Sequence, residues 1–275
     1  MLMPHKPHKR AFSRLREQTL MHYPPQSAIA DAFRLLRTNV RIEVFNNDPQ
    51  HKVLMVTSAG NDEGKTIISC NLAIAFAQEG RRTLLVDSDL RRPSVHLCLG
   101  YRKKEPGLSN ILTDACQPEQ AVQTFVELMM GAVGFDAAIQ TPGLDNLSVI
   151  TTGSTAYSPP DLLESKALDR FFQWAREHYD VVIVDSAPVL AVADPLLVAP
   201  KVESVVLVYK VGKTARKAIQ RAKYQLASIK ATVSGVILNN ISPEVEIGGN
   251  YYYSQYRKPY DQAVTDDVAS PEERA

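Results

Sequence analysis

Cysteine and tryptophan are scarce in this sequence, which has three cysteines and one tryptophan in 275 residues. Cys70, Cys98 and Cys116 form neither a CxxC pair nor a Cys/His ligand spacing. A disulfide framework and a structural zinc site are therefore not predicted. We expect the thiols to be small core hydrophobes in a reducing compartment.

No segment is long and apolar enough to predict a transmembrane helix. The most apolar stretch, VVIVDSAPVLAVADPLLVAP, carries Asp185 and Asp194, whereas a span needs about 20 residues nearly free of charge. The first residues, MLMPHKPHKRAFSRLR, are basic but lack the apolar core of a signal peptide. We expect residues 1–26 to be a flexible basic tail, and weak contact of this tail with an acidic membrane or partner is the alternative.

Excess charge of one sign is also missing. The chain has 31 basic and 30 acidic side chains, so a nucleic-acid partner is not indicated. The hydrophobic fraction of 45% is ordinary for a globular protein. The length allows one large α/β domain or two small ones.

Strand-like and helix-like stretches alternate along most of the chain. This alternation predicts an α/β fold with a mostly parallel central sheet and helices on both faces. The strand-like runs are of the type buried on both faces: KVLMVTS, RTLLVDSD, LSVIT, DVVIVDS, SVVLVYK and TVSGVILNN. Helices are expected at 160–177, at 214–229 and over KTIISCNLAIAFAQEG, where Gly80 suits the C-terminus.

An amphipathic helix is expected at residues 27–45, with Ser27 as its N-cap. Its apolar face would carry Ile29, Phe33, Leu36, Val40 and Val44. Residues 129–146 have no clear period, so we interpret them as a long loop or a short irregular helix. The tail at 248–275 is polar and is expected to be flexible. One domain over 27–247 lies between the two tails.

The sequence TSAGNDEGKT, residues 57–66, follows a predicted strand and opens a predicted helix. That context is typical of a P-loop, in which backbone N–H groups and the helix N-terminus bind phosphates. Ala59 replaces the usual first glycine, and Asn61 and Asp62 are residues that tolerate a left-handed backbone. A chance GKT at a helix start is the alternative. The predicted nucleotide-binding residues are Ala59, Gly60, Asn61, Asp62, Glu63, Gly64, Lys65, Thr66 and Ile67.

Carboxylates follow two of the predicted strands. Asp87 and Asp89 end TLLVDSD, and Asp185 ends DVVIVDS in the manner of a Walker B motif. Ligands bind at the carboxyl ends of parallel strands, and an Asp at this position holds Mg²⁺ directly or through water. The Asp87/Asp89 pair could alternatively be only structural. Together with Lys65 and Thr66, these residues predict phosphoryl transfer from ATP with Mg²⁺.

Seven segments together resemble the bacterial tyrosine kinases of capsule and exopolysaccharide synthesis. They are DAFRLLRTN, TSAGNDEGKT, LLVDSDLRRPSVH, GLSNILTD, SPPDLLES, VVIVDSAP and VSGVILNN, in order across residues 27–260. The resemblance implies that Lys65 and Gly64 hold the ATP phosphates and that Thr66 ligates Mg²⁺. It implies that Asp87 orients or deprotonates the attacking tyrosine, that Asp89 and Asp185 support the metal, and that Asn239 contacts adenine.

The same resemblance gives a role to a cluster of tyrosines near the end of the chain. Five of the eleven tyrosines lie within ten residues, and the resemblance implies that they are phosphoacceptors: Tyr251, Tyr252, Tyr253, Tyr256 and Tyr260. The family's ExxRxxR motif, which assembles subunits into a ring, corresponds here to Asp31, Arg34 and Arg37 in an oligomerisation helix at 27–46. An ordinary solvated charged face is the alternative for this helix. A sticky aromatic tail is the alternative for the tyrosines.

The resemblance also implies partners and a location. The implied partners are a separate transmembrane activator of the chain-length-determinant type and a phosphotyrosine phosphatase. The implied location is the cytoplasm, where the kinase is recruited to the inner face of the membrane.

Two other functions stay open. A partitioning ATPase of the ParA/MinD type would carry a second lysine where this chain has Gly60, and would have no tyrosine cluster. A non-catalytic adaptor of the export complex would bind ATP without forming phosphotyrosine.

Overall fold

The computed structural model describes residues 18–45, 48, 52–100, 105–125, 127, 142–154 and 158–241. The chain divides into two compact units, Met1–Asn239 and Asn240–Ala275. All the helices and strands given below belong to the first unit. In the second unit the structure describes only Asn240 and Ile241.

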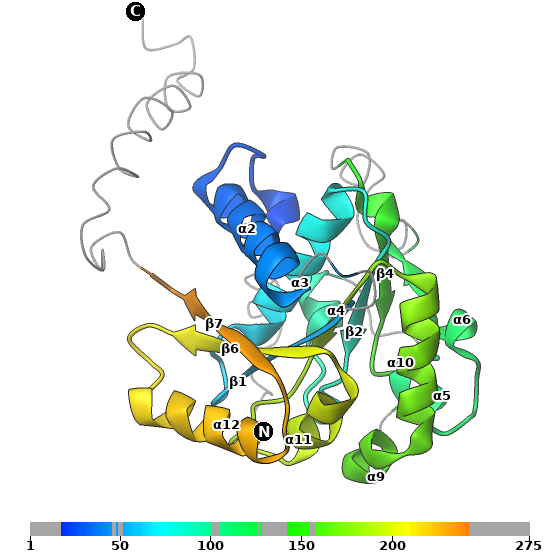
Figure 1. Ribbon diagram of the computed structural model, residues 1–275. Coiled ribbons are helices and arrows are strands. Elements are labelled where there is room, and N and C mark those ends of the chain that lie inside the picture. Colours follow the sequence, from blue (N-terminus) through cyan, green and yellow to red (C-terminus); the bar gives the residue numbers. More distant parts are fainter. Residues whose placement is uncertain are drawn as a thin grey trace, which may run out of the picture. The chain divides into compact units, whose positions relative to one another are not determined.

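Seven strands form one sheet in the order β3-β4-β2-β5-β1-β6-β7 (Figure 1). All neighbouring pairs are parallel except β3 and β4, which are antiparallel. Along the chain the strands are β1 (Val53–Ser58), β2 (Thr83–Asp87), β3 (Gln123–Thr124), β4 (Leu147–Ile150), β5 (Val181–Asp185), β6 (Ser204–Lys210) and β7 (Val233–Asn239). The predicted α/β fold with a mostly parallel sheet is therefore confirmed.

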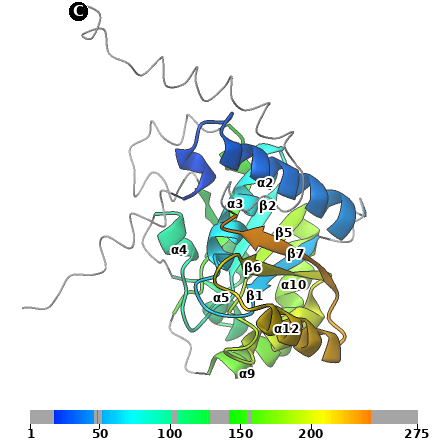
Figure 2. The ribbon, with the colours of Figure 1, turned by 90° about the vertical axis from the view of Figure 1, so that its left-hand side faces the viewer.

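Helices cover both faces of this sheet (Figures 1 and 2). On one face lie η1 (Leu20–His22), α2 (Ala28–Asn39), the π-helical turn η2 (Val40–Val44), α3 (Lys65–Gln78), α4 (Val95–Cys98) and η3 (Leu144–Asn146). On the other lie α5 (Leu108–Leu112), α6 (Pro118–Ala121), α9 (Pro159–Glu164), α10 (Lys166–His178), α11 (Asp194–Val198), η4 (Ala199–Lys201) and α12 (Arg216–Ser228). None of the helices in these described ranges is long and apolar enough to cross a membrane.

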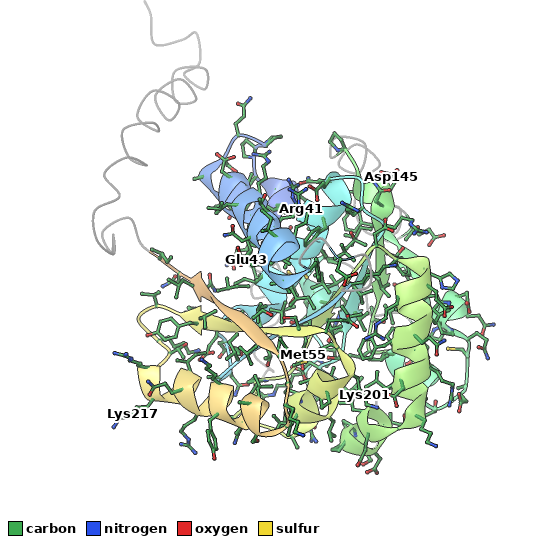
Figure 3. All side chains as sticks on the ribbon, viewed as in Figure 1. Arg41, Glu43, Met55, Asp145, Lys201 and Lys217 are labelled. Atoms are coloured by element: carbon green, nitrogen blue, oxygen red, sulfur yellow. The ribbon has the colours of Figure 1, made fainter. Side chains whose placement is uncertain are left out.

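The central strands are buried on both faces because their side chains alternate between two cores. In β1, Leu54 and Val56 belong to the core beneath α3, whereas Val53 and Met55 belong to the core beneath α10. Figure 3 shows Met55 inside the molecule and Lys217 of α12 directed outward. The expectation for two thiols is confirmed, because Cys70 and Cys98 are fully buried in the first core. Cys116 is half-buried against the second.

Several local predictions are confirmed. The Ser27 hydroxyl accepts a hydrogen bond from the Ala30 backbone at 3.3 Å, so Ser27 is the N-cap of α2. Gly80 follows α3 with a φ of +86°, the left-handed conformation expected after a helix. The helix expected at 160–177 is instead two helices, since the backbone of Ser165 is extended between α9 and α10.

Other predictions need correction. The strand TVSGVILNN is not buried on both faces: β7 lies at the sheet edge, and Val236 and Leu238 are 49% and 45% exposed. Ile29 was expected on the buried face of α2 but is 37% exposed. Within the expected tail at 1–26, Leu20 is buried and its N–H donates to Asn71 of α3 at 2.7 Å, so the packed chain begins before residue 27.

Three predicted regions lie largely outside the described residues. Of the segment 129–146, only 142–146 is described, and it includes the short 3-10 helix η3. Residues 1–17 and the tail at 248–275, with its five tyrosines, are not described. The predicted C-terminal limit of the domain, residue 247, therefore stays a prediction.

Candidate active site

The predicted P-loop connects β1 to α3 at the carboxyl edge of the sheet. Two residues in the loop have left-handed backbones, Asp62 with φ +56° and Gly64 with φ +93°. The tolerance of Asp62 for this conformation is thus confirmed. At Gly64 a side chain is excluded sterically as well, because an added Cβ would lie 2.2 Å from the amide nitrogen of Asn239.

The N-terminus of α3 is suited to an anion. The first N–H groups of a helix, here those of Lys65, Thr66 and Ile67, have no intrahelical acceptor. The first turn of α3 contains no acidic residue, so the partial positive charge of the helix end is not neutralised from within the helix. A phosphate group is a fitting ligand for these N–H groups.

Lysine and asparagine side chains from neighbouring strands hold the loop. The Lys213 ammonium, in the loop after β6, donates to the carbonyls of Asn61 at 2.9 Å and Asp62 at 3.3 Å. The Asn239 amide, at the end of β7, donates to the Glu63 carbonyl at 2.9 Å. The sequence alone did not single out Lys213. Its only signal was its place just after a strand that ends at the same sheet edge.

Thr66 and Asp185 meet directly. The Thr66 hydroxyl donates to one carboxylate oxygen of Asp185 at 2.8 Å, and the Ser69 hydroxyl donates to the other at 3.0 Å. Burial raises the pKa of Asp185 to about 6, although the charge of Lys65 and these two hydrogen bonds oppose the rise. The predicted Walker A hydroxyl and Walker B carboxylate therefore form one oxygen-rich group, of the kind that a hard cation prefers.

Asp87 and Asp89 have different surroundings although they are two residues apart. The Lys65 ammonium lies 3.6 Å from the Asp89 carboxylate. The Asp87 carboxylate accepts hydrogen bonds from the N–H groups of Ser94 and Val95, both at 3.1 Å, and of Asp89 at 3.2 Å. Burial, and next the nearby charge of Asp185, raises the pKa of Asp87 well above its ordinary value.

An ion pair that the sequence analysis did not predict holds the segment after Asp89. Two nitrogens of the Arg91 guanidinium donate to the two oxygens of Asp194, at 2.8 and 3.0 Å. The Asp194 side chain is 1% exposed. Arg91 stands in the quoted motif LLVDSDLRRPSVH, but its partner lies in α11, so only the folded chain reveals the pair.

The described residues contain no group of three or more His, Cys, Asp or Glu side chains that could hold a metal ion by themselves. The oxygens of Thr66 and Asp185, with Asp87 and Asp89 nearby, still fit Mg²⁺. This ion usually keeps several waters and uses one or two carboxylates together with substrate phosphates.

The predicted oligomerisation residues on α2 are divided between two roles. Arg34 and Asp31 form an exposed ion pair with a nitrogen–oxygen distance of 2.7 Å. Arg37 instead turns toward α3, where it donates to the Ala75 carbonyl at 3.0 Å and lies 3.7 Å from Glu79. The predicted phosphoacceptor tyrosines lie outside the described residues.

Comparison with known proteins identifies the family. Residues 54–260 match the CobQ/CobB/MinD/ParA nucleotide binding domain. The tyrosine-protein kinase YwqD of Bacillus subtilis is 35% identical over 242 residues, which cover 87% of this chain and 93% of that protein.

Solved structures agree. The kinase domain of Escherichia coli tyrosine kinase ETK superposes with a TM-score of 0.70 at 28% identity, over 91% of this chain and 88% of that domain. The chimerical protein CapA2B2 superposes with a TM-score of 0.69 at 27% identity, over 82% of this chain and 90% of that one. With its P-loop, its paired acidic strand ends and these relatives, the chain belongs to the bacterial tyrosine-protein kinases within the CobQ/CobB/MinD/ParA group of nucleotide-binding proteins.

Proposed function

We propose that this chain is a tyrosine autokinase that transfers the terminal phosphoryl group of ATP to tyrosines of its own C-terminal segment. The observation that carries the proposal is the convergence of Lys65, Thr66, Asp87 and Asp185 at one sheet edge. The chain with this site also bears five tyrosines within ten residues.

The phosphates of ATP would be bound by the loop N–H groups, by the N-terminus of α3 and by Lys65. The Thr66 hydroxyl and the Asp185 carboxylate would hold Mg²⁺. The Asp89 carboxylate, which lies close to Lys65, would support the ion. When bound, the ion neutralises negative charge on the phosphates. Phosphoryl transfer depends chiefly on such positioning and charge stabilisation.

Asp87 would accept the proton of the attacking phenol. A free tyrosine has a pKa near ~10, so its hydroxyl needs a base close to neutral pH. Burial and the charge of Asp185 raise the pKa of Asp87, which makes its carboxylate a stronger base. The phenol oxygen forms a bond to the terminal phosphorus, the bond from that phosphorus to the leaving oxygen of ADP breaks, and the phenol proton moves to Asp87.

We further propose that the tyrosines react at the site of a neighbouring copy in a ring. The exposed ion pair Asp31–Arg34 and the exposed side chain of Leu35 leave one face of α2 available for a second copy. Arg37 is committed to α3, so its contribution would be to hold this face in place.

The wider setting follows from the family resemblance. We propose that a separate transmembrane activator recruits the chain to the cytoplasmic face of the membrane, and that a phosphatase reverses the modification. The resemblance, together with the likeness to the chimerical protein CapA2B2, supports this proposal. The cycle would regulate polymerisation and export of a capsule or exopolysaccharide.

A nucleotide-dependent adaptor without kinase activity is the second candidate, and the presence of Lys65, Thr66, Asp87, Asp89 and Asp185 disfavours it. The experiment that separates the two incubates the protein with ATP and Mg²⁺, with and without an activator's cytosolic segment, and maps phosphate by mass spectrometry. We expect phosphate on the residues between Tyr251 and Tyr260. Nucleotide binding without any phosphotyrosine in either condition would sink the kinase proposal.

Variants refine this test. Lys65→Met and Asp87→Asn should each abolish the signal, whereas Lys217→Met, at an exposed position on α12, should leave it unchanged. Transfer between copies is tested by mixing Lys65→Met with an active copy whose five tail tyrosines are phenylalanine. Phosphate on the Lys65→Met copy is expected, and its absence would show that transfer occurs within one copy.

A further inference from the structure

A pocket beside the P-loop shares four residues with the predicted nucleotide-binding loop but is lined by none of Lys65, Thr66, Asp87 and Asp185. Its volume is about 350 Å³, which is within the usual range for pockets that bind small ligands. The outer half of the loop, the turn after β5 and the start of α12 form its walls. Its lining residues are Ala59, Gly60, Asn61, Glu63, Leu190, Ala191, Lys213, Thr214, Ala215 and Ala218.

The lining is small and largely apolar. Four alanines, a glycine and Leu190 leave room for a flat ring. Aromatic side chains bury a large area at little cost in conformational entropy, which makes them common anchors in such pockets.

Glu63 adds one unusual polar group. The residue is 4% exposed, and among the described residues its oxygen Oε2 has no hydrogen-bond partner. Glu63 therefore places a poorly solvated carboxylate at this wall, and such a group disfavours an anionic ligand relative to a neutral one.

The Lys213 ammonium, which lines the pocket, already has partners in the loop. The Lys213 ammonium donates to the Asn61 and Asp62 carbonyls and lies 3.6 Å from the Asp62 carboxylate. The N-terminus of α12 also borders the pocket, but the carboxylate of Glu63 opposes an anion there. A neutral phenol therefore fits this pocket better than a phosphorylated one.

The pocket is not at the proposed base. Asp87 ends β2, and β5 lies between β2 and the β1 strand that leads into the pocket wall. A ring in the pocket would thus belong to a residue next to the acceptor in the peptide. The chain offers such residues, because Tyr251, Tyr252 and Tyr253 are consecutive and Tyr256 follows closely.

We propose that this pocket binds an unphosphorylated tyrosine that flanks the acceptor in the 251–260 segment of a second copy. The bound ring anchors the segment while a neighbouring tyrosine reacts, and its own phosphorylation later releases it. The inference rests on the proposed autokinase function but concerns recognition of the substrate, so the two can fail separately.

The test uses synthetic peptides of residues 248–260 and the full-length protein. Binding is measured by fluorescence anisotropy without ATP, so the readout does not require catalysis. Ala218→Leu fills the pocket and should weaken peptide binding about tenfold, in the range for loss of one anchoring contact. Ala227→Leu, an exposed position on the same helix, is the matched control and should bind the peptide as the unmodified protein does.

Two further peptides test whether the pocket recognises a second, unphosphorylated tyrosine. A peptide that keeps one tyrosine and has serine at the other four should bind weakly to both proteins, and Ala218→Leu should raise KM only for the peptide with all five tyrosines. The fully phosphorylated peptide should bind more weakly than the unmodified one. Tighter binding of the phosphorylated peptide would overturn the proposal, as would equal binding to Ala218→Leu and Ala227→Leu.

Controls separate the possible failures. If Ala218→Leu unfolds, Ala191→Leu fills the pocket from the opposite wall and takes its place. If the peptides are phosphorylated but bind the pocket variants as tightly as they bind the unmodified protein, this inference fails and the autokinase proposal stands. If they bind in the pocket but are never phosphorylated, the autokinase proposal fails instead.

Discussion

Asp185 carries a cost to the fold that its proposed function explains. The side chain is fully buried and accepts two hydroxyl hydrogen bonds, yet burial still raises its pKa to about 6. A carboxylate that ionises at neutral pH in such a place destabilises the nucleotide-free fold. A cation bound at this group would remove the penalty, because it supplies the missing positive charge.

Asp185→Asn should therefore stabilise the nucleotide-free protein, measured by thermal unfolding with a chelator present. The folded pKa lies above the ordinary value of 3.8, so the penalty in the unmodified protein is absent below about pH 4, grows as pH rises, and is complete above about pH 6. The gain should follow the same course and reach at most about 3 kcal/mol. In the variant, the Thr66 hydroxyl can donate to Ser94 instead, 2.9 Å away.

The same substitution should remove the dependence of nucleotide affinity on Mg²⁺. The gain in stability of Asp185→Asn over the unmodified protein should be larger at pH 8 than at pH 4. An equal gain at both pH values would contradict this account of Asp185.

Gly64 is required for two separable reasons, its left-handed backbone and its contact with Asn239. Gly64→Ala should lower the free energy of unfolding by at least the strain of about 1–2 kcal/mol for a left-handed alanine. It should also weaken nucleotide binding, because the added Cβ displaces the Asn239 amide from the Glu63 carbonyl.

Gly80→Ala is the matched control for that variant. Gly80 follows the opposite end of α3, has a φ of +86° and has open space where a Cβ would be, so it should show the strain alone and keep its nucleotide affinity. Equal nucleotide affinity in both variants, by calorimetric titration, would rule out a role for the Asn239 contact.

At the scale of whole elements, α2 depends on α3 for its position. Arg37 donates to the last turns of α3, and Arg41 pairs with Glu79 at 2.8 Å. The apolar residues Phe33 and Leu36 pack on the same core. One side of α2 is thereby attached to the sheet layer, and the other side keeps Asp31, Arg34 and Leu35 exposed.

Alanine at the two arginines should separate these roles. Arg37→Ala removes a partly buried charged hydrogen bond and should cost about 1.5–3 kcal/mol of stability. Arg34→Ala removes only an exposed pair, which is worth about 0.2–1 kcal/mol, so its melting temperature should hardly change. If α2 joins copies, Arg34→Ala should nevertheless reduce the molar mass measured by light scattering. Unchanged mass at every protein concentration would count against assembly through this face.

A second connection between elements ties the two acidic strand ends together. Arg91 follows the turn that contains Asp89, and Asp194 begins α11 after the segment that leaves Asp185. Since Asp194 is almost fully buried, the pair cannot open without leaving a charge unsatisfied. The two chain segments that flank the proposed metal site are therefore held in one arrangement.

At the scale of the whole molecule, charge is balanced until the tail is modified. The formal net charge is +1, and each phosphotyrosine would add about −1.5 to −2. Phosphorylation of several tail tyrosines should therefore drive copies apart. Size-exclusion chromatography should show a smaller assembly after incubation with ATP, and Lys65→Met should elute unchanged. Identical elution of phosphorylated and unphosphorylated protein would refute the charge switch.

Much of the fold and of the phosphate site was predictable because the signals are local. Six of the seven strands are short apolar runs, whereas the two-residue strand β3 is polar and was not predicted. The P-loop needs only glycine, lysine and threonine between one strand and one helix. Asp62 is an example of such a local signal, because its left-handed backbone agrees with the tolerance expected from the residue type. Ile29 and β7 show the limit: an apolar pattern does not reveal whether a neighbouring element covers it.

By itself the sequence determined the α/β fold, the phosphate loop, the acidic strand ends and the family. Tertiary structure alone decided which of these groups touch: Thr66 with Asp185, Arg91 with Asp194, and Lys213 with the loop carbonyls. The physical reason is strand order. Residues more than a hundred positions apart, such as Thr66 and Asp185, become neighbours only when β1 pairs with β5, and the pocket beside the loop exists only where three distant segments meet.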